Sequence, residues 1–448
     1  MKDLLAKTAV RRLFVTIGIV AVVALMTGPA GSNQAPVSGF TGSFGEASSF
    51  FGLFRTQRWV TFLGIAVICW GIATLWISQG PRLKRNVHEV LRVPRAVAEK
   101  RPVRWFALLA LLFVAIILPH VETAPFWQAA MVEQISVYVL LAIGLNVVVG
   151  FAGLLDLGYV AFYAIGAYTT AWVTGALPTP PIFGHALNPF WAIPIAIVIV
   201  MITGIILGAP TLRLRGDYLA IVTLGFGEIV TIFANNLYGI TGGSQGSNPI
   251  PHPSLHLGPI KYIWNLAPVP YYYLTLVFIV IFLVVFSLLE HSRVGRAWTA
   301  IREDEVAAES VGINPLKYKV MAFAIGAASA GFAGVVTASQ SNSIFPSSFT
   351  LQFSINILVI VIFGGMGSII GVVLGAIVIQ TVTAYLLHSP PAGYQTSDLY
   401  IYLGAILVTM MIVRPAGLIP SRRRKREITL SEDDHEGHLD EVLLGDDA

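Results

Sequence analysis

The chain has 448 residues, of which 55% are hydrophobic and 12% are charged, and its formal net charge is +4. Its mean hydropathy of +0.75 lies far outside the range of a water-soluble domain, and apolar runs close to the ~20 residues that cross a bilayer recur along it. The composition therefore excludes a soluble protein and indicates a polytopic integral membrane protein. The single cysteine, Cys69, excludes a disulfide within the chain.

The apolar runs predict an all-α fold, a helical bundle with about ten to twelve transmembrane helices. Lipid offers the backbone no hydrogen-bond partner, so runs of this length must be helical, and the short alternating segments of a membrane barrel are absent. The expected spans are residues 13–28, 58–77, 105–119, 127–149, 157–177, 191–212, 218–237, 270–289, 320–339, 351–364, 368–387 and 399–413.

Three regions are expected along the chain. Residues 1–104 form an accessory pair of spans followed by a basic loop, Pro81 to Arg104, which lies along the inner membrane surface because anionic lipid attracts it. Residues 105–415 form the helical core. Residues 416–448 form a cytoplasmic tail that is first basic and then acidic, a composition typical of disorder.

The basic residues predict which side of the membrane each loop faces. With a cytoplasmic N-terminus and twelve crossings, 25 of the 28 Lys and Arg lie inside, and only Arg55, Arg58 and Lys261 do not. Both termini are therefore expected in the cytoplasm. Residues 1–30 have the basic start and apolar core of a signal peptide, yet Pro29 and the spans downstream favour a retained anchor.

Acidic residues within apolar spans are costly, so they mark function or pairing inside a bundle. Glu228 is the deepest, and two interpretations stay open: a hydrogen-bond partner in helix packing, or a residue that lines a translocation route. Gly225 and Gly227 would let another backbone approach under either interpretation. Interfacial anchoring or capping is favoured for the acids near span ends, which are Glu133, Asp156, Asp217 and Glu290.

The longest charged stretch between two apolar spans runs from Glu290 to Lys319 and is predicted to be a helix on the cytoplasmic side. Its charges suit contact with a partner, and its small residues suit close approach to a groove on that partner. The alternative is a solvated amphipathic helix that contacts nothing. The residues singled out are Arg302, Glu303, Asp304, Glu305, Ala307, Ala308 and Gly312.

Motifs for enzymatic chemistry are missing from the sequence. There is no GxxxxGK[ST] phosphate loop, no HExxH pattern and no Cys/His spacing for a metal. The Gly-x-Gly sequences in GFGEI and GGMGS lie in apolar surroundings with no strand before them. We therefore expect a protein that is not an enzyme and has no cofactor or metal of its own.

Four blocks of sequence, in the right order, resemble the M-type permease subunit of branched-chain amino-acid ABC importers. LNVVVGFAGLLDLGYVAFYAIGAY (Leu145 to Tyr168) resembles an early glycine-punctuated signature, and LRLRGDYLAIVTLGFGEIV (Leu212 to Val230) resembles the most characteristic block. ITGGSQG (Ile240 to Gly246) resembles a TGG-x-x-G loop, and IREDEVAAESVGIN (Ile301 to Asn314) resembles the segment that docks on the ATPase. The sequence departs at LLDLG, where Gln-Ser is usual, so the role of Asp156 stays open.

The resemblance covers about residues 130 to 415 and implies a function. It implies the permease of a binding-protein-dependent importer in a bacterial inner membrane that moves branched-chain amino acids inward. Its protein partners would be a second permease subunit, two ATP-binding subunits that hold the ATP, and an extracytoplasmic substrate-binding protein. It would also contact the amino acid and membrane lipid, and no nucleic acid is expected. Glu228, Gly225 and Gly227 would lie on the translocation path together with Gly242 and Gly243 of the outer loop 238–269, which is otherwise expected to be a rigid cap.

Two alternatives remain beside this interpretation. One is a related importer for urea or short amides. The other is an ion-coupled secondary carrier, but such carriers often have matching intramembrane acids in two repeats, and Glu228 has no evident counterpart. A membrane-embedded enzyme is disfavoured because no nucleophile, base pair or set of metal ligands is visible.

Overall fold

The computed structural model describes residues 112–121, 124–181, 184–212, 217–257, 260–388, 399–413 and 417–419. The chain divides into two compact units, one of Met1–Ala115 and Tyr385–Val413 and one of Ile116–Ala384 and Arg414–Ala448. The second unit contains most of the described elements, whereas α17 (Leu399–Val413) belongs to the first.

Seven helical stretches of the described residues are long and apolar enough to cross a membrane. The first, Pro125–Phe151, is continuous and consists of α5 (Pro125–Ala130), the π-helix η1 (Met131–Ser136), α6 (Val137–Leu145) and the π-helix η2 (Asn146–Phe151). The others are α8 (Pro189–Thr211), α9 (Asp217–Asn236), α11 (Pro268–His291), α14 (Pro315–Ser341), α15 (Leu351–Gly364), which follows the 3₁₀ turn η4 (Pro346–Ser348), and α16 (Ile369–His388).

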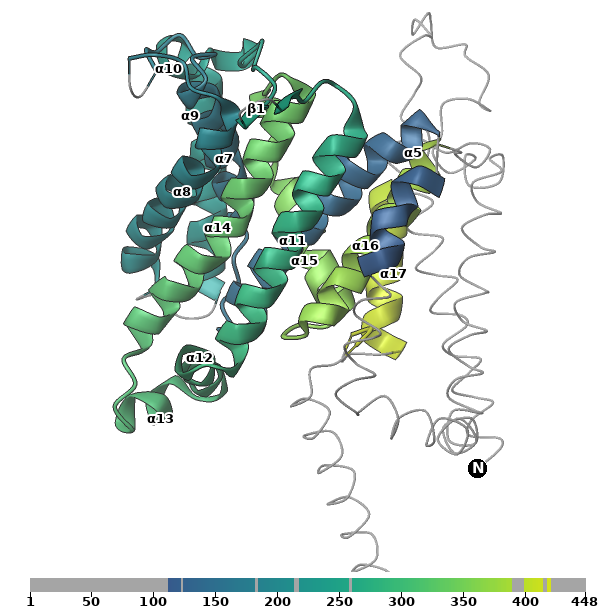
Figure 1. Cartoon of the computed structure of the whole chain (residues 1–448). Coiled ribbons are helices and arrows are strands. Elements are labelled where there is room, and N and C mark those ends of the chain that lie inside the picture. Colours follow the sequence, from purple (N-terminus) through teal and green to yellow (C-terminus); the bar gives the residue numbers. More distant parts are fainter. Residues whose placement is uncertain are drawn as a thin grey trace, which may run out of the picture. The chain divides into compact units, whose positions relative to one another are not determined.

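Shorter elements join these spans. They are a helix at Leu112–Val121, α7 (Tyr159–Val173), α10 (Tyr238–Thr241), the 3₁₀ turn η3 (Gly243–Gln245), β1 (Ser254–Leu257), β2 (Ile260–Ile263), α12 (Arg293–Glu303) and α13 (Glu305–Ser310). Within the second unit, α12 and α13 lie at one end of the bundle, whereas α10 and β1 lie at the other (Figure 1).

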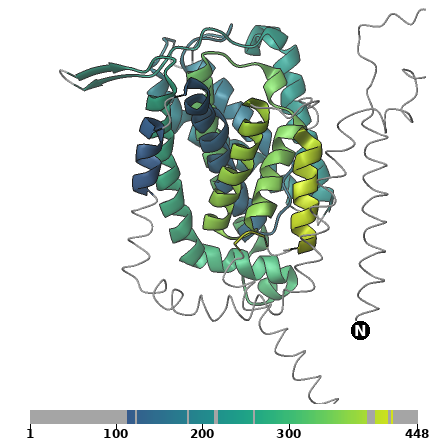
Figure 2. The same cartoon turned by 90° about the vertical axis from the view of Figure 1, so that its right-hand side faces the viewer.

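The all-α prediction is confirmed, and most expected spans agree with described helices to within a few residues. The expected spans 13–28 and 58–77 lie outside the described residues, so the total number of spans and the three-region division stay predictions. One departure is the antiparallel hairpin of β1 and β2, which projects from the bundle (Figure 2). Its short runs SLHL and IKYI flank a Gly-Pro pair, a pattern typical of a hairpin.

The core of the second unit surrounds α14, which packs against α6, α7 and α8. Glycines allow the short distance between α14 and α7. A Cβ on Gly166 would lie 2.5 Å from the Gly331 carbonyl oxygen, and a Cβ on Gly334 would lie 2.4 Å from the Tyr163 carbonyl oxygen. Small residues of this kind let transmembrane helices approach until their backbones touch. The bundle is therefore held by close backbone contact along α14.

Candidate functional site

Three short polar side chains define the turns at the α12 end of the bundle. Ser292 accepts hydrogen bonds from the first amides of α12, at 3.1 Å from Val294 N. Asp304 Oδ1 accepts from Val306 N and from a second amide of α13, both at 2.9 Å. Asn314 caps the start of α14 through the amide of Lys317. Each cap satisfies backbone donors that a helix start leaves free, so the local sequence itself dictates the turns.

The inner side of α12 is fixed to the transmembrane core. Trp298 is completely buried, its Nε1 donates to the Tyr318 carbonyl oxygen at 2.7 Å, and its ring stacks on Phe151. Arg302 Nη1 donates to the Gly150 carbonyl oxygen. Because Phe151 and Gly150 form the end of η2, α12 is attached directly to the first transmembrane stretch of the core.

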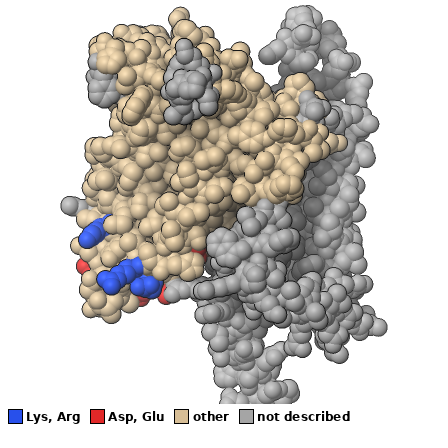
Figure 3. Space-filling view, viewed as in Figure 1, with Lys and Arg blue, Asp and Glu red and all other residues tan. Residues whose placement is uncertain are grey.

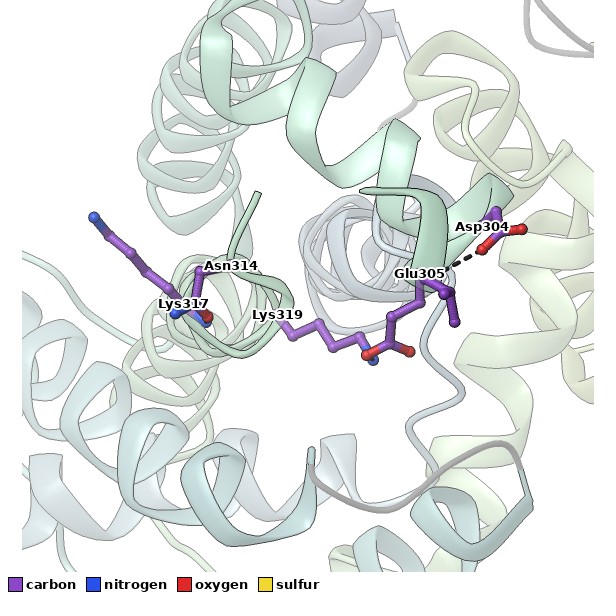
Figure 4. A network of polar contacts seen from close by, with 6 residues as sticks. Asp304, Glu305, Asn314, Lys317 and Lys319 are labelled. Carbon is purple, nitrogen blue, oxygen red and sulfur yellow. Dashed lines mark hydrogen bonds and ion pairs between the residues drawn. The ribbon is translucent and has the colours of Figure 1, made fainter. Parts of the chain in front are cut away.

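An ion pair with a buried lysine links α13 to α14. Lys319 Nζ lies 2.7 Å from Glu305 Oε1, and the exposed fractions of the two side chains are 6% and 35%. Figure 4 shows these side chains pointing toward one another, while Lys317 points away to the other side of α14. A buried ammonium requires such a partner, since an unpaired charge away from water is very costly.

The outer side of α13 is open and partly apolar. Val306 and Val311 are 65% and 76% exposed, and Glu309 lies exposed between them. A cavity of about 550 Å³ opens beside it, lined by Leu212, Glu305, Glu309, Gly312, Ile313, Asn314, Pro315 and Leu316. In the view of Figure 3, the charged side chains of the described surface gather at this end. We call this solvent-facing side the α13 surface. It combines Val306 and Val311 with the carboxylates of Glu305 and Glu309 and the cavity beside them.

The structure assigns different positions to the residues predicted for a coupling loop. Arg302 and Glu305 bind the chain itself, and Ala308 is buried. Gly312 has a left-handed backbone with φ of 87° and ends α13, and no atom lies within 4 Å of the place of a Cβ. This conformation explains a glycine by itself. The exposed members are Arg302, Glu303, Asp304, Ala307 and Gly312, although Arg302 also bonds to Gly150.

Sequence reasoning missed the anchors and the valines of this site. Trp298 and Lys319 are the anchors, and a large aromatic residue in a polar segment was a usable signal for the first. Nothing in the sequence indicated that Val306 and Val311 are exposed, because valine is usually assigned to a core.

The residues predicted for a translocation path do not form one cluster. Glu228 is exposed on α9 and has no hydrogen-bond partner among the described residues, so no packing role for it is seen in that part of the chain. Gly227 faces α7, where its Cβ would lie 3.4 Å from Gly158 Cα, whereas Gly225 faces open space. Gly242 and Gly243 both have positive φ and shape the turn after α10.

Two of the acids expected near span ends, Asp156 and Glu133, have surroundings that hydropathy alone does not predict. Asp156 is buried in the irregular segment between η2 and α7, where one carboxylate oxygen accepts from Gly158 N at 2.9 Å. Glu133 lies within the continuous stretch Pro125–Phe151, in η1, more than two turns from its start.

Comparisons with known proteins agree on one family. Residues 129–413 match the family described as "Branched-chain amino acid transport system / permease component". The chain is 40% identical over 334 residues to the high-affinity branched-chain amino acid transport system permease protein LivM of Escherichia coli K12, covering 70% of this chain and 75% of that protein. It is 27% identical over 289 residues to LivH, another such permease protein of Escherichia coli K12, covering 63% and 91%. No solved structure matches the chain.

The ion pair between α13 and α14 generates a stability prediction. Glu305→Gln should lower the free energy of unfolding by about 1–3 kcal/mol, because it strands the buried ammonium of Lys319, while the partial exposure of Glu305 reduces the cost. The measurement is thermal unfolding of the purified protein in detergent. Combining Glu305→Gln with Lys319→Met should restore much of the loss.

The matched control is Glu309→Gln, an exposed carboxylate on the same short helix. It should change stability by no more than about 0.5 kcal/mol, as is usual for surface substitutions. Equal stability of Glu305→Gln and Glu309→Gln would show that the ion pair does not hold α13 in place.

Proposed function

The chain belongs to the family of branched-chain amino acid transport system permease components, and we propose that it is a permease subunit of an importer that moves branched-chain amino acids across a bacterial inner membrane. Separate subunits bind and hydrolyse the ATP, since this sequence has no phosphate loop. The names of the relatives favour this substrate over urea or short amides, and favour such a transport system over an ion-coupled carrier.

A second, homologous permease subunit completes the pathway in this proposal. LivM and LivH of Escherichia coli K12 are both named as permease proteins of a high-affinity branched-chain amino acid transport system, and this chain resembles both. Because its identity to LivM is the higher one, 40% against 27%, we assign it the LivM-type position and leave the other position to a LivH-type chain.

The α13 surface carries the proposal for coupling to an ATPase subunit. Trp298, Arg302 and Lys319 hold the core-facing side of α12 and α13. A force on these two helices would therefore act on the transmembrane helices. The α13 surface offers Val306 and Val311 beside carboxylates. A partner groove with an apolar floor and a basic rim fits this surface in shape and charge. An ATPase subunit is the occupant we assign to it.

The outward face of α9 carries the proposal for the permease pair. Ile221, Ile229, Ile232 and Phe233 are exposed along it, and Glu228 lies among them. A carboxylate that faced lipid at this depth would be costly, so a polar or protein surface must cover it. We assign this face to the second permease subunit, with Glu228 on the translocation path between the two chains.

The opposite end of the bundle faces the extracytoplasmic substrate-binding protein. The hairpin and the segments beside it expose Tyr238, Ile240, Ile263 and Leu266. The distribution of the basic residues supports an orientation with this end outside, the α13 surface inside and both chain termini in the cytoplasm.

The docking prediction concerns Val311→Asp, which places a charge in the apolar part of the contact. Affinity for the ATPase subunit should fall about 30-fold, or about 2 kcal/mol, the effect of losing a well-packed interface residue. The measurement is binding of purified ATPase subunit to the permease pair in detergent. Lys317→Ala is the control, because Lys317 points away from α13 (Figure 4), and it should bind normally. Normal binding by Val311→Asp would leave α13 as a solvated helix.

The prediction for α9 compares two variants in the complete transporter. Ile232→Arg should prevent co-purification of the second permease subunit, because an exposed apolar contact would become charged. Glu228→Gln keeps the shape and hydrogen bonding of the side chain, so assembly should be retained while uptake falls several-fold. The control for insertion is the amount of each variant in the membrane fraction. Wild-type assembly and uptake by both variants would assign this face to lipid.

The topology prediction uses single cysteines in a Cys69→Ser background. Gln245→Cys, in the outer turn η3, should react with an impermeant maleimide added to spheroplasts, whose outer membrane has been removed and whose inner membrane is intact. Glu309→Cys, on the α13 surface, should react only after the inner membrane is opened. The reverse pattern would contradict the orientation derived from the basic residues.

A further inference from the structure

The stretch Pro125–Phe151 is enclosed by the bundle along most of its length, with 83% of its most apolar window buried. Within residues 130–150, all of which the structure describes, Glu133 is the single exposed side chain. A helix face turned to lipid would expose further residues every three to four positions. On the same face, Pro125 is exposed and Ala129 is half-buried before Glu133, whereas Ser136 and Val137 one turn after it are buried. The exposure that begins at the start of the stretch therefore ends at Glu133, which lies in a local opening and not on a lipid-facing stripe that runs along the whole helix.

The hydrogen bonding of Glu133 leaves acceptors without donors. Its Oε1 accepts from Gln340 Nε2 of α14 at 3.1 Å. Gln340 is only 4% exposed, and its own Oε1 is buried without a hydrogen-bond partner. No Lys, Arg or His among the described residues forms an ion pair with Glu133. A carboxylate and an orphaned amide oxygen thus lie on neighbouring side chains, and a primary ammonium group supplies the three donors that both could accept.

The backbone at Glu133 is held in an unusual conformation. Residues Met131–Ser136 form the π-helix η1, and the Ser136 hydroxyl donates to the Met131 carbonyl oxygen at 2.6 Å. Met131 and Val132 pack against Tyr271 and Tyr272 of α11, which fixes one side of the turn. A π-helical turn in a helix is often found at functional sites. Here the π turn carries the exposed carboxylate of Glu133 directly after two residues that an apolar contact holds in place.

An aromatic surface begins farther along the same stretch. Tyr138 lies five residues after Glu133, about 7 Å along the helix axis. Its ring contacts Phe353 of α15 at a centroid distance of 4.9 Å, and Phe353 stacks on Tyr163 of α7 at 5.1 Å. Tyr138 and Phe353 are half-buried, so part of each ring is open. These rings offer apolar contact to an aliphatic side chain, and Glu133 offers charge to an ammonium.

We propose that Glu133 and Gln340 form a site for the primary ammonium group of the transported amino acid, with its aliphatic side chain against Tyr138 and Phe353. The site lies nearer the outer end of the bundle, because Phe151, at the far end of the same stretch, contacts α12. The site rests on the proposed function, since a branched-chain amino acid carries both the ammonium and the aliphatic group. A lysine of the second permease subunit has the same ammonium chemistry, so the experiment must separate the two sources.

The experiment uses the complete transporter in proteoliposomes, with both permease subunits, the ATPase subunits and binding protein loaded with leucine. Glu133→Gln keeps the size of the side chain and its bond to Gln340 while removing the charge. It should retain the second permease subunit and the ATPase activity that the binding protein stimulates, while leucine moved per ATP hydrolysed falls at least about tenfold, the effect of one lost charged contact. Gln134→Met, a change on the same π turn, should transport normally and serves as the control.

A second measurement tests the ammonium directly. 3-Methylbutylamine has the ammonium and the branched chain of leucine without its carboxylate, whereas 3-methylbutan-1-ol lacks the charge. The amine should inhibit uptake by the wild-type transporter, the alcohol should not, and Glu133→Asp should retain inhibition by the amine. Normal uptake by Glu133→Gln, or equal inhibition by amine and alcohol, would overturn the site. Loss of the second permease subunit from Glu133→Gln would assign the charge to that subunit, which also overturns it.

Failure of the proposed function would look different. In that case the wild-type transporter itself would show no leucine uptake driven by ATP, whatever residue stands at position 133. A working wild-type transporter with a fully active Glu133→Gln variant would instead reject only the ammonium site.

Discussion

The arrangement of the core depends on the close approach of α14 to the helices around it. Lipid tails are as apolar as the side chains that face them, so helices in a membrane gain little from burying apolar surface against each other. They associate through van der Waals contact, which requires small residues at the crossing points. Gly331 and Gly334 on α14 meet Gly166 and the Tyr163 backbone on α7, and Gly326 approaches the Gly144 carbonyl of α6. Larger side chains at these glycines would push the helices apart.

Because α14 lies at the centre of the bundle, it also links contacts at the two ends of the bundle. The helix runs from Pro315 to Ser341, about 40 Å at 1.5 Å per residue. Lys319, near its start, holds Glu305 of α13, and Gln340, near its end, holds Glu133 of η1. One helix therefore connects the α13 surface with the acidic opening toward the opposite end of the bundle. Because α7 and α8 also pack on α14, a movement at either end must be shared by several spans.

Much of the fold follows from the sequence, and the orientation of individual charges does not. Hydropathy predicted the helices because lipid enforces backbone hydrogen bonding, and α15 and α17 have the predicted bounds. The charged segment was predicted as a single helix, whereas the caps at Ser292 and Asp304 divide it into α12 and α13. Yet whether a charge faces a partner or its own chain depends on distant residues. Arg302 binds Gly150, 152 positions away, and no local pattern contains that information.

Glu133 illustrates the same limit and explains why its position matters. Sequence groups it with the interfacial acids, since hydropathy cannot locate a π turn or show that Glu133 is the one exposed residue within positions 130–150. The stretch that carries it ends at Gly150 and Phe151, which bind Arg302 and Trp298 of α12. Two continuous sets of contacts, or routes, therefore connect the α13 surface with Glu133. One runs through α14 and the other through the stretch Pro125–Phe151. Because Trp298 of α12 also donates to the Tyr318 carbonyl oxygen of α14, the two routes are joined at this end of the bundle, and the hydrogen bond between Gln340 and Glu133 joins them again at the other.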